Sequence, residues 1–193
     1  MTYPATLTFD APEKVSNWRP LVQWILAIPH FIIGYVINIV AGIAIFIGWF
    51  AIVITGKLPA GIANFVCMSV RYQTRVGAYA GFLHGEYPPF DFATTAADPG
   101  GQPIRVDFEP ALEGRSRLTV FFRIFWIIPA LLFAIVIYIV AEIVWFLAFF
   151  AVLFTGKWPT GLLKFATGAL RYGTRYSAYG NLLTDQYPPF DLD

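Results

Sequence analysis

Two long apolar stretches dominate the chain, and each is followed by a segment of mixed polarity. The first stretch covers residues 21–54 and the second residues 118–154. The second has no Lys or Arg after Arg123, the first has none at all, and Glu142 is their one acid. Because about 18 consecutive apolar residues suffice for a membrane-spanning helix, the pattern predicts two membrane elements.

A shift of one hundred residues superimposes the second half of the chain on the first. A repeat of this length marks a duplicated structural unit. We therefore expect one repeat over residues 1–92, a linker rich in turn residues over 93–102, and a second repeat over 103–193. Three motifs recur: Thr-Gly-Lys-x-Pro-x-Gly from Thr55 and Thr155, Arg-Tyr-x-Thr-Arg from Arg71 and Arg171, and Tyr-Pro-Pro-Phe-Asp from Tyr87 and Tyr187.

Each repeat also has a short alternating segment at its start and a helical segment after its apolar stretch. Residues 5–9 and 104–108 alternate apolar with polar side chains, which predicts a β-strand in each repeat. Residues 60–84 and 160–184 have one apolar and one basic face, which predicts amphipathic helices at the membrane interface. The expected fold class is an all-α membrane protein of two tandem repeats, with a short N-terminal β-strand in each.

Length alone leaves the number of crossings per apolar stretch open. One helix over residues 21–54 would be about 51 Å long against a hydrocarbon core of about 30 Å, so it would tilt or kink at Pro29. A helical hairpin fits the core and places every Lys and Arg on one side of the membrane, as the positive-inside rule asks. We favour the hairpin in a multi-pass protein, with a single long kinked helix as the alternative.

Composition narrows the class of function. Hydrophobic residues make up 58% of the chain and charged residues 13%, with a net charge of +1, so no attraction to nucleic acid is expected. Cys67 is the single cysteine, which excludes an intrachain disulfide and a cysteine-based zinc site. The sequence has no Ser/His/Asp set, phosphate loop or metalloprotease motif. We expect no enzyme activity, no cofactor and no metal.

The repeated arginines are the strongest candidate site. Two arginines four residues apart lie on one face of a helix, and guanidinium groups match phosphate, so an anionic lipid headgroup is the expected ligand. As an alternative, the arginines pair with Asp91 and Asp191 of the Tyr-Pro-Pro-Phe-Asp motifs. The predicted lipid-binding set is Arg71, Thr74, Arg75, Arg171, Thr174, Arg175, Lys57 and Lys157.

Polar residues inside the apolar stretches form a second, weaker candidate. Asn38 and Glu142 stand near the middle of their stretches, and an intramembrane carboxylate often belongs to an ion or proton site. The first repeat has Gly42 where the second has Glu142, which argues against a symmetric site. In a hairpin, Glu142 would lie near the turn and be solvated.

The three motifs, each after a long apolar stretch, resemble a family of bacterial integral-membrane proteins known as a domain of unknown function, in its tandem form. The resemblance implies the bacterial inner membrane and transfers no catalytic residue. We expect a non-enzymatic scaffold or accessory subunit that engages anionic lipid or a larger membrane complex. A small transporter or channel, built as a homo-oligomer, is the alternative.

Overall fold

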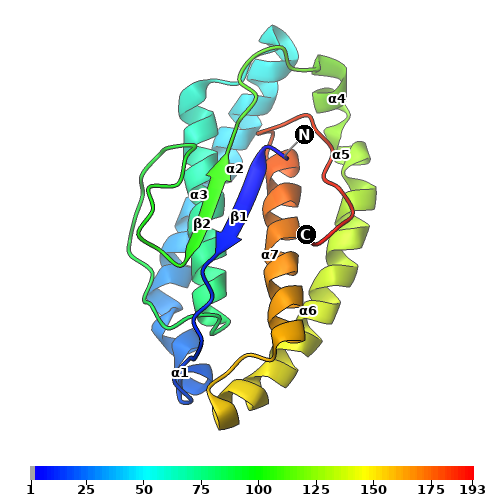
Figure 1. The fold of residues 1–193 in the computed structure, drawn as a ribbon. Helices are drawn as coiled ribbons and strands as arrows, with labels where there is room; N and C mark the ends of the chain where they lie inside the picture. Colours follow the sequence, from blue (N-terminus) through cyan, green and yellow to red (C-terminus); the bar gives the residue numbers. More distant parts are fainter. Residues whose placement is uncertain (1–2) are drawn as a thin grey trace.

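The computed structural model describes residues 3–193, which form a mostly helical fold with one small sheet (Figure 1). The elements, in chain order, are β1 (Ala5–Phe9), α1 (Arg19–Leu26), α2 (Ile28–Thr55), α3 (Ala60–Ala80), β2 (Ile104–Phe108), α4 (Arg117–Phe121), α5 (Arg123–Trp126), α6 (Ile128–Thr155) and α7 (Thr160–Gly180). The predicted strands are confirmed. The helices predicted over 60–84 and 160–184 end earlier, at Ala80 and Gly180.

Three layers build the molecule. β1 and β2 pair antiparallel, with Ala5 opposite Phe108, so the strand of each repeat finds its partner in the other repeat. β1 packs on α7 and β2 packs on α3, which places the sheet in front of these two helices (Figure 1). The long apolar helix α2 packs on α3, and α6 packs on α7. Helices α3 and α7 therefore form the middle layer, between the sheet and the apolar helices.

The helical hairpin expected for each apolar stretch is wrong. Residues 28–55 and 128–155 each form one uninterrupted helix of 28 residues. The interior of these segments has no proline or turn-forming pair to reverse the chain, and Asn38 and Gly42 do not break α2. The break comes before Pro29, which occupies the first turn of α2, where its missing N–H costs no hydrogen bond. This agrees with the alternative of a long kinked helix.

The Thr-Gly-Lys motif ends each long helix. Gly56 and Gly156 adopt the left-handed conformation, with φ of 72° and 68°, as C-terminal helix caps commonly do. The hydroxyls of Thr55 and Thr155 accept a hydrogen bond from the backbone N–H of the lysine two residues on, at 3.1 Å in both copies. The motif is thus a helix stop, which explains its presence in both repeats.

The two repeats are inverted relative to each other. α2 ends beside the start of the second repeat, where Arg115 N donates to Gly56 O at 3.1 Å and Trp49 Nε1 to Val120 O at 3.1 Å. α6 ends beside the start of the first repeat, where Val15 N donates to Gly156 O at 2.8 Å. Helices α2 and α6 consequently run in opposite directions (Figure 1).

The two basic helices are interior elements, which corrects their expected place at the membrane interface. Twelve of the 21 residues of α3 are buried, including Arg71 and Arg75. The basic face of α3 lies against the sheet and the linker, and that of α7 against the sheet. The sequence pattern of such a helix is the same as that of an interfacial helix, so the pattern alone does not distinguish them.

Apolar side chains cover the outer layer. Both long helices are apolar enough to cross a membrane, and only 22% and 28% of their most apolar windows are buried. A core helix of a soluble protein would be mostly buried, so these helices leave a wide apolar surface uncovered on the side away from the sheet. Large exposed side chains on it include Phe31, Tyr35, Ile39, Phe46 and Phe50 of α2 and Leu132, Ile135, Ile139, Phe146 and Phe150 of α6.

Candidate functional site

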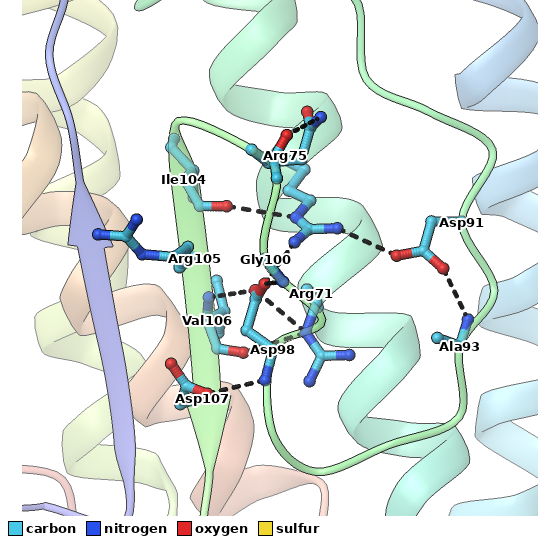
Figure 2. Close-up of polar contacts among 12 residues, drawn as sticks. Arg71, Arg75, Asp91, Ala93, Asp98, Gly100, Ile104, Arg105, Val106 and Asp107 are labelled. Atoms are coloured by element: carbon cyan, nitrogen blue, oxygen red, sulfur yellow. Dashed lines mark hydrogen bonds and ion pairs between the residues drawn. The ribbon is translucent and has the colours of Figure 1, made fainter.

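Arg71 and Arg75 hold a buried carboxylate from the linker (Figure 2). Arg75 Nη2 lies 2.7 Å from Asp98 Oδ1, and Arg71 Nε lies 3.4 Å from Asp98 Oδ2. The side chains of Arg71 and Asp98 are 3% and 2% exposed. Burial lowers the pKa of Arg71, which the nearby Asp98 opposes. A buried charge requires a partner, so Asp98 and the two arginines stabilise one another.

The same carboxylate organises the linker backbone. Asp98 accepts hydrogen bonds from the N–H groups of Gly100 and Val106, both at 2.7 Å. Arg71 donates to the carbonyls of Val106, Thr95 and Ala96 at 2.9–3.0 Å. The arginine side chains therefore fasten β2 and the linker to α3, as Figure 2 shows.

The Tyr-Pro-Pro-Phe-Asp motif also meets the arginines, as the alternative interpretation expected. Arg75 Nη1 lies 3.4 Å from Asp91 Oδ2, and Arg175 Nη1 lies 2.5 Å from Asp191 Oδ1. In the second repeat Arg171 donates to the carbonyl of Leu7 in β1 at 3.3 Å. Each arginine pair thus secures one strand of the sheet and one Asp of the motif.

The other predicted lipid ligands lie elsewhere. Lys57 is 62% exposed and reaches Glu113 at 2.8 Å, while the Lys157 side chain is also exposed, at the opposite end of the molecule. The hydroxyls of Thr74 and Thr174 donate to the carbonyls four residues earlier in their helices, at 2.9 Å. The structure therefore does not bring the predicted set together as one site.

The sequence reasoning missed a second ionic cluster, which belongs to the second repeat. Arg115 and Arg123 both donate to Asp185 Oδ1, at 2.8 and 2.5 Å, and Ser116 N donates to its other oxygen. Burial raises the pKa of Asp185, but the hydrogen bonds from Arg115 and the Ser116 backbone, with the charges of Arg115 and Arg123, outweigh it and leave the pKa below its usual value. The first repeat has Val15, Gln23 and Gly85 at the three positions. Their joint replacement was the pattern that could have revealed the cluster.

Asn38 and Glu142, the predicted intramembrane polar residues, line two neighbouring cavities. Asn38 and Tyr138 line a cavity of about 450 Å³ whose other walls are polar and apolar residues of α2, α3 and α7. Tyr138 also borders a cavity of about 330 Å³ that contains Glu142. The two polar residues are thus close to a common groove, on the face away from the sheet.

Comparison with known proteins gives one match. The family model for a domain of unknown function (DUF4389) matches residues 17–91 and again residues 117–191. The chain belongs to this family. No curated protein and no solved structure matches the chain. Each DUF4389 repeat includes its apolar helix, its basic helix and its Asp of the Tyr-Pro-Pro-Phe-Asp motif, whereas β1, β2 and Asp98 lie outside the matched segments.

The arginines of the first DUF4389 repeat are therefore buried in contacts within the chain. The guanidinium groups of Arg71 and Arg75 bind carbonyls and carboxylates, and the two residues are 2% and 5% exposed. Arg171 and Arg175 of the second repeat are half-buried, and Arg171 donates only to the carbonyl of Leu7. Arg71 and Arg75 fix the position of β2 and the linker and leave little surface for a phosphate.

Proposed function

We propose that this protein is a non-enzymatic accessory or scaffold protein of the bacterial inner membrane. The observation that carries the proposal is the separation of the molecule into an apolar layer, α1–α2 with α4–α6, and a polar sheet on the opposite side of α3 and α7. Burying the apolar layer in lipid is favourable by about 25 cal/mol per Å² of apolar surface.

The same separation favours a protein that lies along the membrane plane. The sheet packs against the middle of α3 and α7, so helices standing upright would hold Arg105 and Asp107 of its outer face at mid-membrane depth. Each charged side chain there costs roughly 2.5–3.5 kcal/mol. A helix lying flat is about 10–12 Å thick and fits within one leaflet of about 15 Å. The multi-pass arrangement is the competing geometry.

Exposed cations supply the contact with anionic lipid in this proposal. Lys57 and Arg117 stand at one end of the apolar layer, and Lys14 and Lys157 at the other, next to the two helix caps. Each contributes roughly 1 kcal/mol near an anionic surface.

Vesicle flotation tests this assignment. Replacing these four residues by Gln should weaken binding to phosphatidylglycerol vesicles but not to phosphatidylcholine vesicles, and added salt should mimic the effect. Arg105→Gln, on the sheet face, is the control and should leave flotation unchanged. Equal binding of the quadruple variant and the native chain to anionic vesicles would refute the lipid contact.

A small oligomeric transporter is the second candidate, favoured by the inverted repeats and the polar cavity that they share. Purification in mild detergent separates the two. A stoichiometric protein partner supports the accessory role, whereas a lone ring-shaped homo-oligomer supports transport.

A further inference from the structure

A groove with a polar floor runs along the face of the molecule away from the sheet. Its main cavity has a volume of about 450 Å³ and is formed by both repeats together. Polar side chains that line it come from four helices: Asn38 of α2, Gln73 and Thr74 of α3, Tyr138 of α6, and Thr174 and Ser177 of α7. None of its lining residues carries a formal charge.

Several of these polar groups are free to bind a ligand. Gln73 donates to the carbonyl of Gly34 at 2.8 Å, and the two threonines bond to their own helices. Asn38, Tyr138 and Ser177 also line the cavity, and within residues 3–193 their exposed or half-buried side chains form no hydrogen bond with the protein. The tyrosine hydroxyl lies against Gly173, where any side chain would collide with it.

The two repeats differ at this site in a complementary way. The first repeat supplies Asn38 and Gln73, and the second supplies Tyr138 and Gly173 at the same positions. The larger side chain of one helix is matched by the smaller one on its neighbour, so the cavity keeps its polar lining without being filled.

Apolar walls continue the cavity toward the membrane-facing side. Gly42 and Ile45 belong both to this cavity and to a second one of about 550 Å³, whose further lining is mainly apolar. Its one charged residue, Arg123, is already paired with Asp185 at 2.5 Å. A ligand that fits both must have a polar head and a hydrocarbon tail.

We propose that the groove binds an uncharged lipid whose head carries hydroxyl groups, such as a diacylglycerol or a glycosylated diacylglycerol. The hydroxyls would bond to Asn38 and Tyr138, and the acyl chains would leave between α2 and α6. A phosphate in this cavity would be without a cation among its lining residues, and an unpaired buried charge is costly. The inference rests on the proposed membrane association, because the tails require a bilayer.

Native mass spectrometry of the whole protein in detergent tests the site, with dioleoylglycerol as the probe. Tyr138→Phe removes one hydroxyl at nearly constant volume and should weaken binding about threefold to tenfold. Adding Asn38→Leu should weaken it further. The matched control is Tyr35→Phe, because Tyr35 lies on the outer face of α2 with 70% exposure, and it should bind as the native chain does.

The outcomes separate the site from the proposed function. Flotation with vesicles should be the same for all these variants, and its loss in the native chain would contradict membrane association itself. With flotation intact, an absence of dioleoylglycerol binding overturns the site, as does equal binding by the Tyr138→Phe and Tyr35→Phe variants. Equal or tighter binding of dioleoylphosphatidylglycerol, weakened by the same variants, overturns the neutral head. Binding of free glycerol with the same dependence on Tyr138 overturns the lipid.

Discussion

At the scale of single residues, Asp98 should contribute the largest ionic term. It is buried between two buried arginines, so Asp98→Asn leaves Arg71 without a carboxylate and Arg75 with Asp91 alone, and should cost about 3–5 kcal/mol. Asp191, 53% exposed, pairs with one arginine, and Asp191→Asn should cost about 1 kcal/mol or less. Chemical denaturation in detergent measures both. Equal costs for the two variants would contradict a structural role centred on Asp98.

His84 should make the free energy of unfolding depend on pH above the range in which Asp and Glu side chains titrate. Burial lowers the pKa of His84 from 6.5 to about 4, so its stabilising neutral form is fully favoured above pH 6.5 and is lost as pH falls toward 4. The native chain should lose roughly 2 kcal/mol more than His84→Thr between pH 7 and pH 5. Thr is the residue of the second repeat at this position, Thr184.

Denaturation midpoints of the two proteins at pH 7 and pH 5 provide the measurement, since their other titrating groups are the same and cancel. Parallel pH dependence in both proteins would show that His84 is solvated in the native state.

The sequence predicts part of the candidate site for physical reasons. The pairs of Arg75 with Asp91 and of Arg175 with Asp191 could be proposed because both partners belong to repeated motifs. The pair with Asp98 could not be proposed, because Asp98 stands in a linker without a counterpart in the other repeat, and the linker residues are typical of a turn. An arginine that faces lipid differs from one bonded within the protein by its burial. That burial depends on the strand supplied by the other repeat, which the local sequence does not reveal.

At the scale of elements, the repeat pattern predicts the strands, the helices and the kink before Pro29. It does not predict the number of membrane crossings, because a continuous apolar helix of 28 residues can either cross the bilayer or lie along it. Charge distribution favoured the hairpin. A flat orientation satisfies the same positive-inside argument with continuous helices, since both helix ends then face one side.

The two helix caps provide a matched pair for testing the elements. Gly56→Ala meets no atom closer than 3.5 Å and should cost about 1–2 kcal/mol for its left-handed conformation alone. Gly156→Ala adds a contact at 3.0 Å with the carbonyl of Val15 and should cost more. Thermal unfolding of the two variants measures the difference, and a smaller effect at Gly156 would contradict the packing of the first repeat against the end of α6.

At the scale of the whole molecule, two exchanges bind the repeats into one structure. Each strand pairs with that of the other repeat, and the start of each repeat covers the helix cap of the other. The repeats should therefore unfold together, since neither completes its layers without the other. The resulting inversion places Lys57 and Lys157 at opposite ends of the apolar layer.

The orientation of that layer is tested most directly by labelling these two positions. Single cysteines at Lys57 and Lys157, in a Cys67→Ala background, are exposed to an impermeant thiol reagent on intact inverted and right-side-out membrane vesicles. Helices that lie along the membrane place both positions on one side, so both cysteines should react in the same vesicle type. Reaction of one in each type would show that α2 and α6 cross the bilayer and would contradict the flat orientation.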